Sequence, residues 1–158
     1  MSSADKNLSH FSFPIPQLPS ARVAIVTAEW NTEVTNALRQ GAVDLLIEAG
    51  FPENQIIQKH VPGSYELIFG SDQLASRSDV DAVIALGCVV QGETRHFDFI
   101  CDAVAHGIYQ VSLKHQKPVI FGVLTTDNQQ QALERAGGKH GNKGAEAAYT
   151  ALRLLEEF

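Results

Sequence analysis

Apolar residues gather in four short runs along the chain, and the segments between the runs have apolar positions at helical spacing. The runs are RVAIVTA (22–28), QIIQKHV (55–61), VDAVIALGCVV (80–90) and PVIFGVLTT (118–126). Short runs rich in Val and Ile predict β-strands. Helical spacing predicts five helices, over residues 32–49, 64–77, about 92–115, 128–136 and 144–158. Gly50 follows the first helix and is typical of a helix C-terminus.

This alternation of strands and helices determines the expected fold class. Near-continuous apolar strands that alternate with helices favour a parallel sheet covered on both faces. We therefore predict an α/β fold, a three-layer α/β/α sandwich with a flavodoxin-like, parallel four-stranded sheet. Residues 1–20 are polar and contain Pro14, Pro16 and Pro19, which favour an extended N-terminal arm. Residues 21–158 are predicted to form a single domain.

Composition and charge narrow the functional classes. The chain has 158 residues, of which 44% are hydrophobic and 19% charged, as in globular proteins. Its formal net charge of −6 disfavours binding to nucleic acid, which requires a basic surface. No apolar segment is long enough for a membrane span and residues 1–20 lack the pattern of a signal peptide, so we expect a cytoplasmic location. Cys88 and Cys101 form no CxxC pair and lie in apolar runs, which indicates buried free thiols.

Residues that follow each predicted strand are candidates for function, because such sheets bind ligands beyond the carboxyl ends of their strands. Glu-Trp-Asn (29–31) follows the first run and contains the only tryptophan, Trp30. This indole either caps the core or offers a flat face for stacking an aromatic ligand. Pro-Gly-Ser-Tyr-Glu (62–66) follows the second run. Within it, Gly63 permits close backbone approach, and Glu66 is either a first-turn acid or a ligand contact.

The segment QGETRH (91–96), after the third run, contains an acid, a hydroxyl, an arginine and a histidine within six residues. If the next helix begins near residues 92–94, the backbone N–H groups of Glu93 and Thr94 form an anion site, to which the Thr94 hydroxyl adds a donor. His96 lies beside this site and can give or accept a proton near neutral pH. We therefore interpret His96 as catalytic and His106, further along the same helix, as structural.

Metal and nucleotide sites are not predicted. His96, Asp98 and Cys101 do not share one face of a helix, as paired ligands would. The glycine-rich segment GGKHGNKG (137–144) follows a predicted helix and fits neither the P-loop nor the dinucleotide-binding pattern.

Five motifs, in order along the chain, resemble the lumazine synthase family. They are EWN (29–31), VPGSYE (61–66), LGCVVQGETRHFDFIC (86–101), PVIFGVLTT (118–126) and QALERAGGKHGNKGAEAA (131–148). The resemblance implies a transferase of riboflavin biosynthesis that needs no cofactor. Its reaction condenses 5-amino-6-(D-ribitylamino)uracil with 3,4-dihydroxy-2-butanone 4-phosphate to give 6,7-dimethyl-8-ribityllumazine, phosphate and water. The alternative is a non-catalytic flavin-binding, lumazine-binding or shell-forming relative, against which the retention of His96 and Arg135 argues.

The resemblance also implies a role for each candidate residue. His96 transfers protons, Trp30 stacks on the pyrimidine ring and Arg135 pairs with the phosphate. The other implied substrate contacts are Asn31, Ser64, Tyr65, Glu66, Cys88, Val89, Val90 and Phe121, and the other implied phosphate contacts are Glu93 and Thr94.

A homo-oligomer is the last implication of the resemblance. Members of the family form rings of five, with active sites between adjacent subunits, and some rings close further into an icosahedral shell of sixty chains. Riboflavin synthase is an implied protein partner, beside the small-molecule substrates. The segment FSFPIPQ (11–17) alternates apolar residues with polar ones or proline, so the arm is expected to lie along the sheet edge of another subunit.

Overall fold

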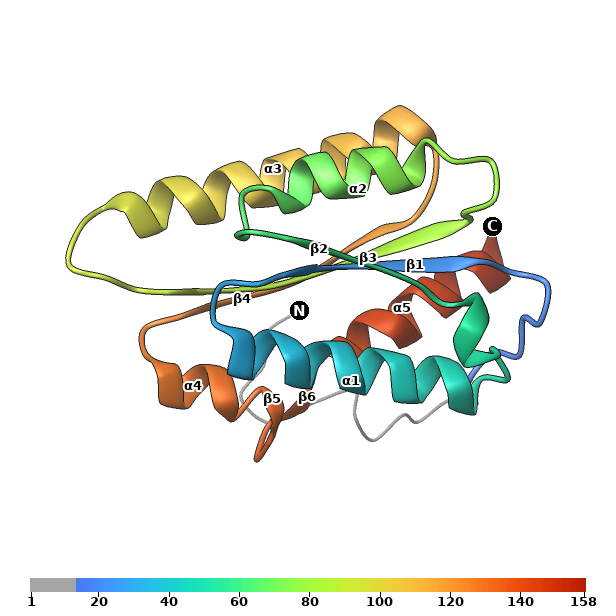
Figure 1. Ribbon diagram of the computed structural model, residues 1–158, viewed down its shortest axis with the longest axis horizontal. Coiled ribbons are helices and arrows are strands. Elements are labelled where there is room, and N and C mark those ends of the chain that lie inside the picture. Colours follow the sequence, from blue (N-terminus) through green and yellow to red (C-terminus); the bar gives the residue numbers. More distant parts are fainter. Residues whose placement is uncertain (1–13) are drawn as a thin grey trace.

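The computed structural model describes residues 14–158 and is built around a four-stranded parallel sheet (Figure 1). The strand order is β2-β1-β3-β4, and every neighbouring pair is parallel. The strands are β1 (Val23–Ala28), β2 (Ile57–Val61), β3 (Ala82–Val90) and β4 (Val119–Thr126). All four strands therefore lie where the apolar runs predicted them, with ends that differ by at most two residues.

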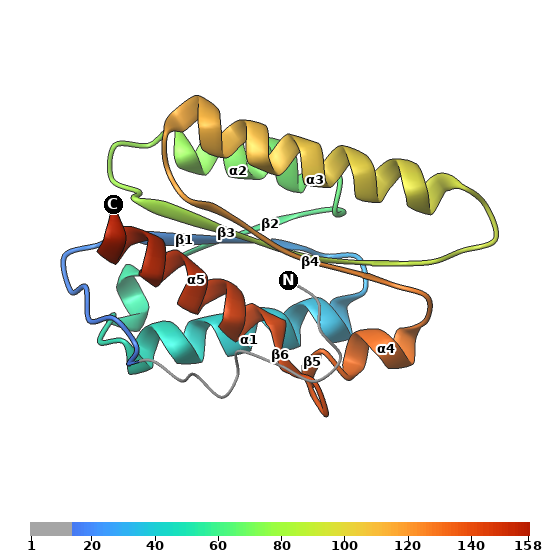
Figure 2. The ribbon, with the colours of Figure 1, turned by 180° about the vertical axis from the view of Figure 1, so that it is seen from behind.

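Helices cover both faces of the sheet (Figures 1 and 2). One face carries α1 (Thr32–Glu48), α5 (Lys143–Glu157) and the short α4 (Gln129–Leu133), and the other carries α2 (Leu67–Ala75) and α3 (His96–His115). The prediction of a three-layer α/β/α sandwich is confirmed. Gly50, with φ of 88°, follows the last turn of α1 as expected of a C-terminal glycine.

Side chains of β1 alternate between the two layers of the core. Val23 and Ile25 pack with α1 and α5, whereas Ala24 and Val26 pack with α2 and α3. All six residues of β1 are buried, because this strand lies inside the sheet and both of its faces are covered. Burial on both faces explains why the strand reads as a continuous apolar run.

Residues 136–142 depart from the predicted pattern. The helix expected over 128–136 ends at Leu133, and an antiparallel ribbon follows, made of β5 (Ala136–Gly138) and β6 (Gly141–Asn142). Gly137 and Gly141 adopt positive φ values of 115° and 74°, which a helix cannot accommodate. Asn142 then caps α5, because its Oδ1 accepts hydrogen bonds from the N–H groups of Gly144 and Ala145.

The described part of the N-terminal segment lies against its own chain. Ile15 and Leu18 are partly buried against the core layer that contains α1 and α5. Of the three apolar residues that motivate the prediction of an arm on another subunit, Ile15 packs on its own chain, and Phe11 and Phe13 lie outside the described residues. Within residues 14–158, none of the helices is both long and apolar enough to cross a bilayer.

Candidate active site

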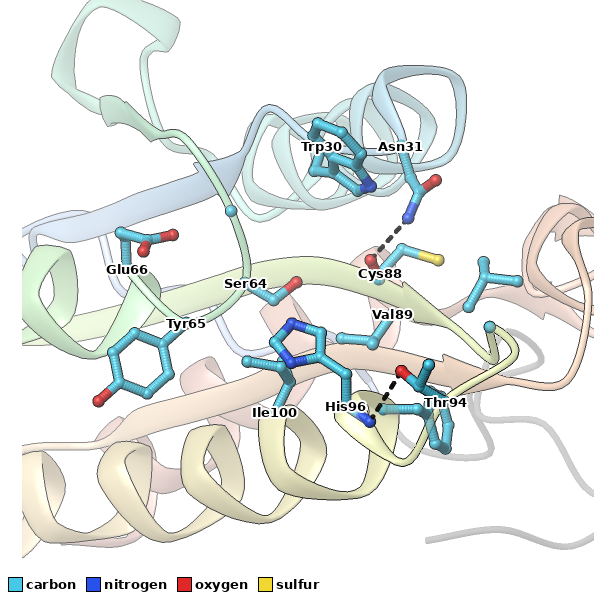
Figure 3. A pocket seen from close by; sticks show the side chains of 14 residues that line it. Trp30, Asn31, Ser64, Tyr65, Glu66, Cys88, Val89, Thr94, His96 and Ile100 are labelled. Atoms are coloured by element: carbon cyan, nitrogen blue, oxygen red, sulfur yellow. Dashed lines mark hydrogen bonds between the residues drawn. The ribbon is translucent and has the colours of Figure 1, made fainter.

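A cavity of about 610 Å³ opens at the carboxyl ends of β1 and β3 (Figure 3). From β1 the chain continues to one edge of the sheet, at β2, and from β3 it continues to the other edge, at β4. Open parallel sheets bind ligands at such a point, where the direction of winding reverses. Figure 3 shows Trp30 and Asn31 on one side, His96, Thr94 and Ile100 on the other, and Ser64, Cys88 and Val89 between them. The cavity is lined by Trp30, Asn31, Gly63, Ser64, Tyr65, Glu66, Cys88, Val89, Val90, Gly92, Thr94, His96, Phe97 and Ile100.

The turn after β1 forms one wall. The Trp30 side chain is 73% exposed, so it does not cap the core and its ring is available to a ligand. Backbone hydrogen bonds hold this turn to the end of β2, from Glu29 N to Val61 O at 2.8 Å and from Trp30 N to Pro62 O at 3.1 Å. The indole therefore stands on a fixed backbone at the mouth of the cavity.

The turn after β2 places a buried hydroxyl in the cavity. Ser64 is only 7% exposed, and its Oγ has no hydrogen-bond partner among the described residues. Gly87 of β3 makes room for it, because a Cβ at residue 87 would lie 2.7 Å from that oxygen. This oxygen is closed off from solvent, so a bond to a ligand would require the Ser64 side chain to turn toward the cavity. Tyr65 and Glu66, further along the same turn, are exposed.

The end of β3 forms the base of the cavity. Cys88 is 1% exposed, and burial raises the pKa of its thiol to about 11. The thiol is therefore uncharged at neutral pH and is a poor nucleophile. Val89 and Val90 follow it and are partly buried. This part of the wall can contribute apolar contacts and backbone hydrogen bonds, but no charge.

The first turn of α3 supplies the polar groups on the opposite side. His96 is exposed and lines the cavity together with Thr94, whose Oγ1 is 3.4 Å from the His96 backbone nitrogen. The helix begins at His96, so the predicted start near residues 92–94 is wrong. Gly92 and Thr94 have low helix propensity, and Arg95 O is the carbonyl that accepts the first bonds, from Asp98 N at 3.1 Å and Phe99 N at 3.4 Å. The N–H groups of the helix start are therefore those of His96 and Phe97, instead of those of Glu93 and Thr94.

Three of the predicted site residues do not line the cavity of a single chain. Glu93 is exposed in the loop before α3. Phe121 lies in the edge strand β4 and is 42% exposed. Arg135 follows α4, and its Nη1 donates to the carbonyl of Gln131 at 3.0 Å. Their predicted contacts to substrate remain predictions.

The sequence profile of the family described as 6,7-dimethyl-8-ribityllumazine synthase matches residues 20–158. The chain belongs to the lumazine synthase family. Three relatives bearing that name are similar over nearly the whole chain. The protein from Cytophaga hutchinsonii is 62% identical over 157 residues, or 99% of each chain. The protein from Porphyromonas gingivalis is 52% identical over 98% of this chain and 96% of its own, and the one from Parabacteroides distasonis is 47% identical over 98% of each.

The resemblance drawn from the motifs is thus confirmed, and so is the prediction of an enzyme of the transferase class. Most of the residues that the lumazine synthase motifs implicate gather in the cavity, together with Gly63, which was singled out for its backbone. Sequence reasoning missed Gly92, Phe97 and Ile100 as lining residues. Ile100 could have been found, because it lies four residues after His96 and residues i and i+4 share one helix face. Among residues 14–158, no cluster of three or more His, Cys, Asp or Glu side chains is arranged to hold a metal ion.

Proposed function

We propose that this chain condenses 5-amino-6-(D-ribitylamino)uracil with 3,4-dihydroxy-2-butanone 4-phosphate to form 6,7-dimethyl-8-ribityllumazine, with release of phosphate and water. The observation that carries the proposal is the cavity at the ends of β1 and β3, in which an exposed indole faces a histidine at a helix start. The family membership supports the same reaction. The chain would act in riboflavin biosynthesis, and we expect it in the cytoplasm.

The uracil would bind between the Trp30 turn and the end of β3. The Trp30 ring is exposed and can stack on the pyrimidine. The unpaired Ser64 hydroxyl, with Tyr65 and Glu66 beside it, supplies polar partners for the ribityl chain. Cys88, Val89 and Val90 would contact the ring edge from below, mainly through their backbone.

The phosphate would bind at the start of α3. A helix N-terminus attracts anions, and the Thr94 hydroxyl adds a neutral donor that lines the same cavity. His96 stands in the same turn and so can move protons close to the leaving phosphate. Arg135 is the cation that would pair with the phosphate, and a guanidinium suits this task because it can donate two parallel hydrogen bonds.

Each step of the reaction requires proton transfer or stabilisation of a leaving anion. The amine of the uracil adds to the ketone carbon, and loss of water gives an imine. The phosphate then leaves with the electrons of its C–O bond, and closure of the second ring releases another water molecule. His96 would give and take the protons, while Thr94 and Arg135 stabilise the departing phosphate. Holding two substrates side by side supplies much of the remaining acceleration.

The site would be completed by a second copy of the chain. Phe121 and Arg135 do not line the cavity of their own chain, so their predicted roles require a neighbour. Large apolar side chains are exposed on α2 and α3, namely Phe69, Phe99, Tyr109 and Leu113, as expected of a surface that is covered by another subunit. We propose a ring of five chains with one site at each interface, and further closure into a shell of sixty. Riboflavin synthase would be the protein that uses the product.

Mixing the purified chain with both substrates tests the function. Absorbance of the lumazine should appear together with an equal amount of phosphate, and each substrate alone should give neither. Lack of product at high protein concentration would overturn the proposal in favour of a non-catalytic relative. Sedimentation tests the assembly: with a chain of 17.2 kDa, a species of about 1 MDa supports the shell and a species five times the chain mass supports the ring alone. An active monomer would contradict the shared site.

A further inference from the structure

The turn between β1 and α1 is bonded to both sides of the cavity. Its backbone is tied to the end of β2 by the bonds of Glu29 and Trp30 described above. On the other side, the Nδ2 of Asn31 donates to the carbonyl of Cys88 at 2.9 Å, a contact drawn in Figure 3. A single residue after the indole thus connects the Trp30 turn to the base of the site.

The bond from Asn31 reaches a carbonyl of β3, that of Cys88, which lies beyond the last residue of β3 that pairs with β1. β1 and β3 are paired only as far as Thr27 and Leu86. β3 continues to Val90 with β4 on its other side, so the strand end that forms the base of the cavity has lost β1 as a neighbour. The Asn31 amide takes the place of a β1 amide and bonds the Cys88 carbonyl across this gap.

The backbone of Asn31 is unusual as well. Its φ of 61° and ψ of 46° are left-handed, and among the described residues only Asn31 and Gln116 combine a side chain with positive φ. This conformation lets the Asn31 carbonyl start α1, accepting from Val34 N at 2.9 Å and Thr35 N at 3.0 Å, while the side chain reaches back to β3. Glycine would allow this backbone but has no amide, and most other residues disfavour it. Asparagine satisfies both requirements.

We infer that Asn31 is a positioning residue, which holds the Trp30 indole and the Cys88 end of β3 at a fixed separation so that a planar ring fits between them. This inference rests on the proposed function, because it specifies how the uracil side of that site is kept in shape. One N–H of the Asn31 amide is engaged by the protein, so the positioning role is proposed beside the predicted substrate contact of Asn31. His96 and Thr94 lie on the opposite side of the cavity, so they should be unaffected by its loss.

Asn31→Gly is an informative variant, because glycine tolerates the positive φ and has no side-chain amide. Glycine also frees the backbone of the turn, so Asn31→Asp, which tolerates positive φ and has no N–H to donate, is measured beside it and should show the same changes. We expect the KM of Asn31→Gly for the ribitylaminouracil to rise by roughly fivefold to tenfold, the effect of losing one hydrogen bond. The kcat and the KM for the butanone phosphate should stay within about twofold of the wild type, a range smaller than one weak hydrogen bond. Asn31→Ala should show the same KM change and a lower Tm in addition, because alanine disfavours positive φ.

The fluorescence anisotropy of Trp30 separates positioning from stability, because it would stay unchanged if Asn31 contributed only to the stability of the fold. Trp30 is the only tryptophan, so all indole emission reports on this turn. In Asn31→Gly the anisotropy should fall at temperatures far below the Tm, whereas Asn36→Ala, on an exposed position of α1, should match the wild type in every measurement.

Two results would overturn the inference. An Asn31→Gly enzyme with wild-type KM and anisotropy would mean that the amide positions nothing. A raised KM with unchanged anisotropy would mean that Asn31 acts on the substrate directly. If the wild-type chain formed no lumazine, the proposed function would fail, yet the anisotropy of Asn31→Gly would still decide whether the amide holds the Trp30 turn.

Discussion

Replacement of His96 by alanine should slow lumazine formation by roughly tenfold to a thousandfold. General acid–base assistance is typically worth about 10²–10⁴ in rate. The His96 side chain is exposed in an open cavity, so water can take over part of the proton transfer, and the expected loss is about tenfold smaller than that range at each end. Trp30 and Ser64 belong to other elements, so both substrates should still be held together. The barrier therefore rises by about 1.4–4 kcal/mol, while KM changes little.

The assay is steady-state lumazine absorbance at saturating substrate, checked by phosphate release. His106→Ala is the matched control, because His106 lies in the same helix, is also exposed and does not line the cavity. It should retain wild-type kcat. Added imidazole should restore part of the rate of His96→Ala, because the cavity is open to solvent. A kcat within twofold of the wild type, or an equal loss in His106→Ala, would refute the role of His96.

Three further predictions concern other residues. Arg135→Ala should raise the KM for the butanone phosphate roughly tenfold or more, the effect of losing a charge-assisted hydrogen bond, and a rise confined to the uracil would contradict the proposed phosphate contact. With a pKa of about 11, Cys88 should react with iodoacetamide at pH 8 roughly a hundredfold more slowly than a free cysteine, and mass spectrometry showing complete modification within minutes would count against this. Hydrogen bonds from Lys114, at 2.7 Å, and from His115, at 2.8 Å, hold the pKa of Asp72 below its ordinary value of 3.8. The carboxylate thus stabilises the fold above about pH 4 and loses this effect as pH falls through the lowered pKa. Asp72→Asn should therefore lower the Tm at pH 7 more than at pH 3, and an equal difference at both would be inconsistent with this ion pair.

The strands β1 and β3 were predictable from sequence because buried parallel strands are continuously apolar, and the partly exposed edge strand β2 because its run ends at Pro62 and Gly63. Once the carboxyl ends were located, Trp30, Glu66 and Thr94 followed as candidates, and the structure brings all three to one cavity. The start of α3 was not predictable to the residue, since QGETRH contains both helix-favouring and helix-disfavouring residues. The ribbon at residues 136–142 was missed because its glycines act through positive φ, which periodicity does not reveal.

Contacts that cross the cavity were beyond sequence reasoning. Asn31 is a reasonable residue for a left-handed position, but its bond to Cys88 depends on how β1 and β3 separate. Phe121 and Arg135 do not line the cavity of one chain, and in the proposed assembly their places in the site would depend on a second chain. The two residues became candidates only through the resemblance to the lumazine synthase motifs.

Titration of Trp30 fluorescence with the ribitylaminouracil tests most directly whether this cavity is where lumazine forms. The signal is specific because Trp30 is the only tryptophan and lines the cavity. Without the second substrate, the emission should be quenched saturably, with a midpoint equal to the KM for the uracil within about twofold, as expected when chemistry is slower than substrate release. Trp30→Phe should keep an aromatic face and retain activity while the signal disappears. Turnover of both substrates with no change in Trp30 emission, up to concentrations well above the KM, would contradict the assignment of this cavity as the active site.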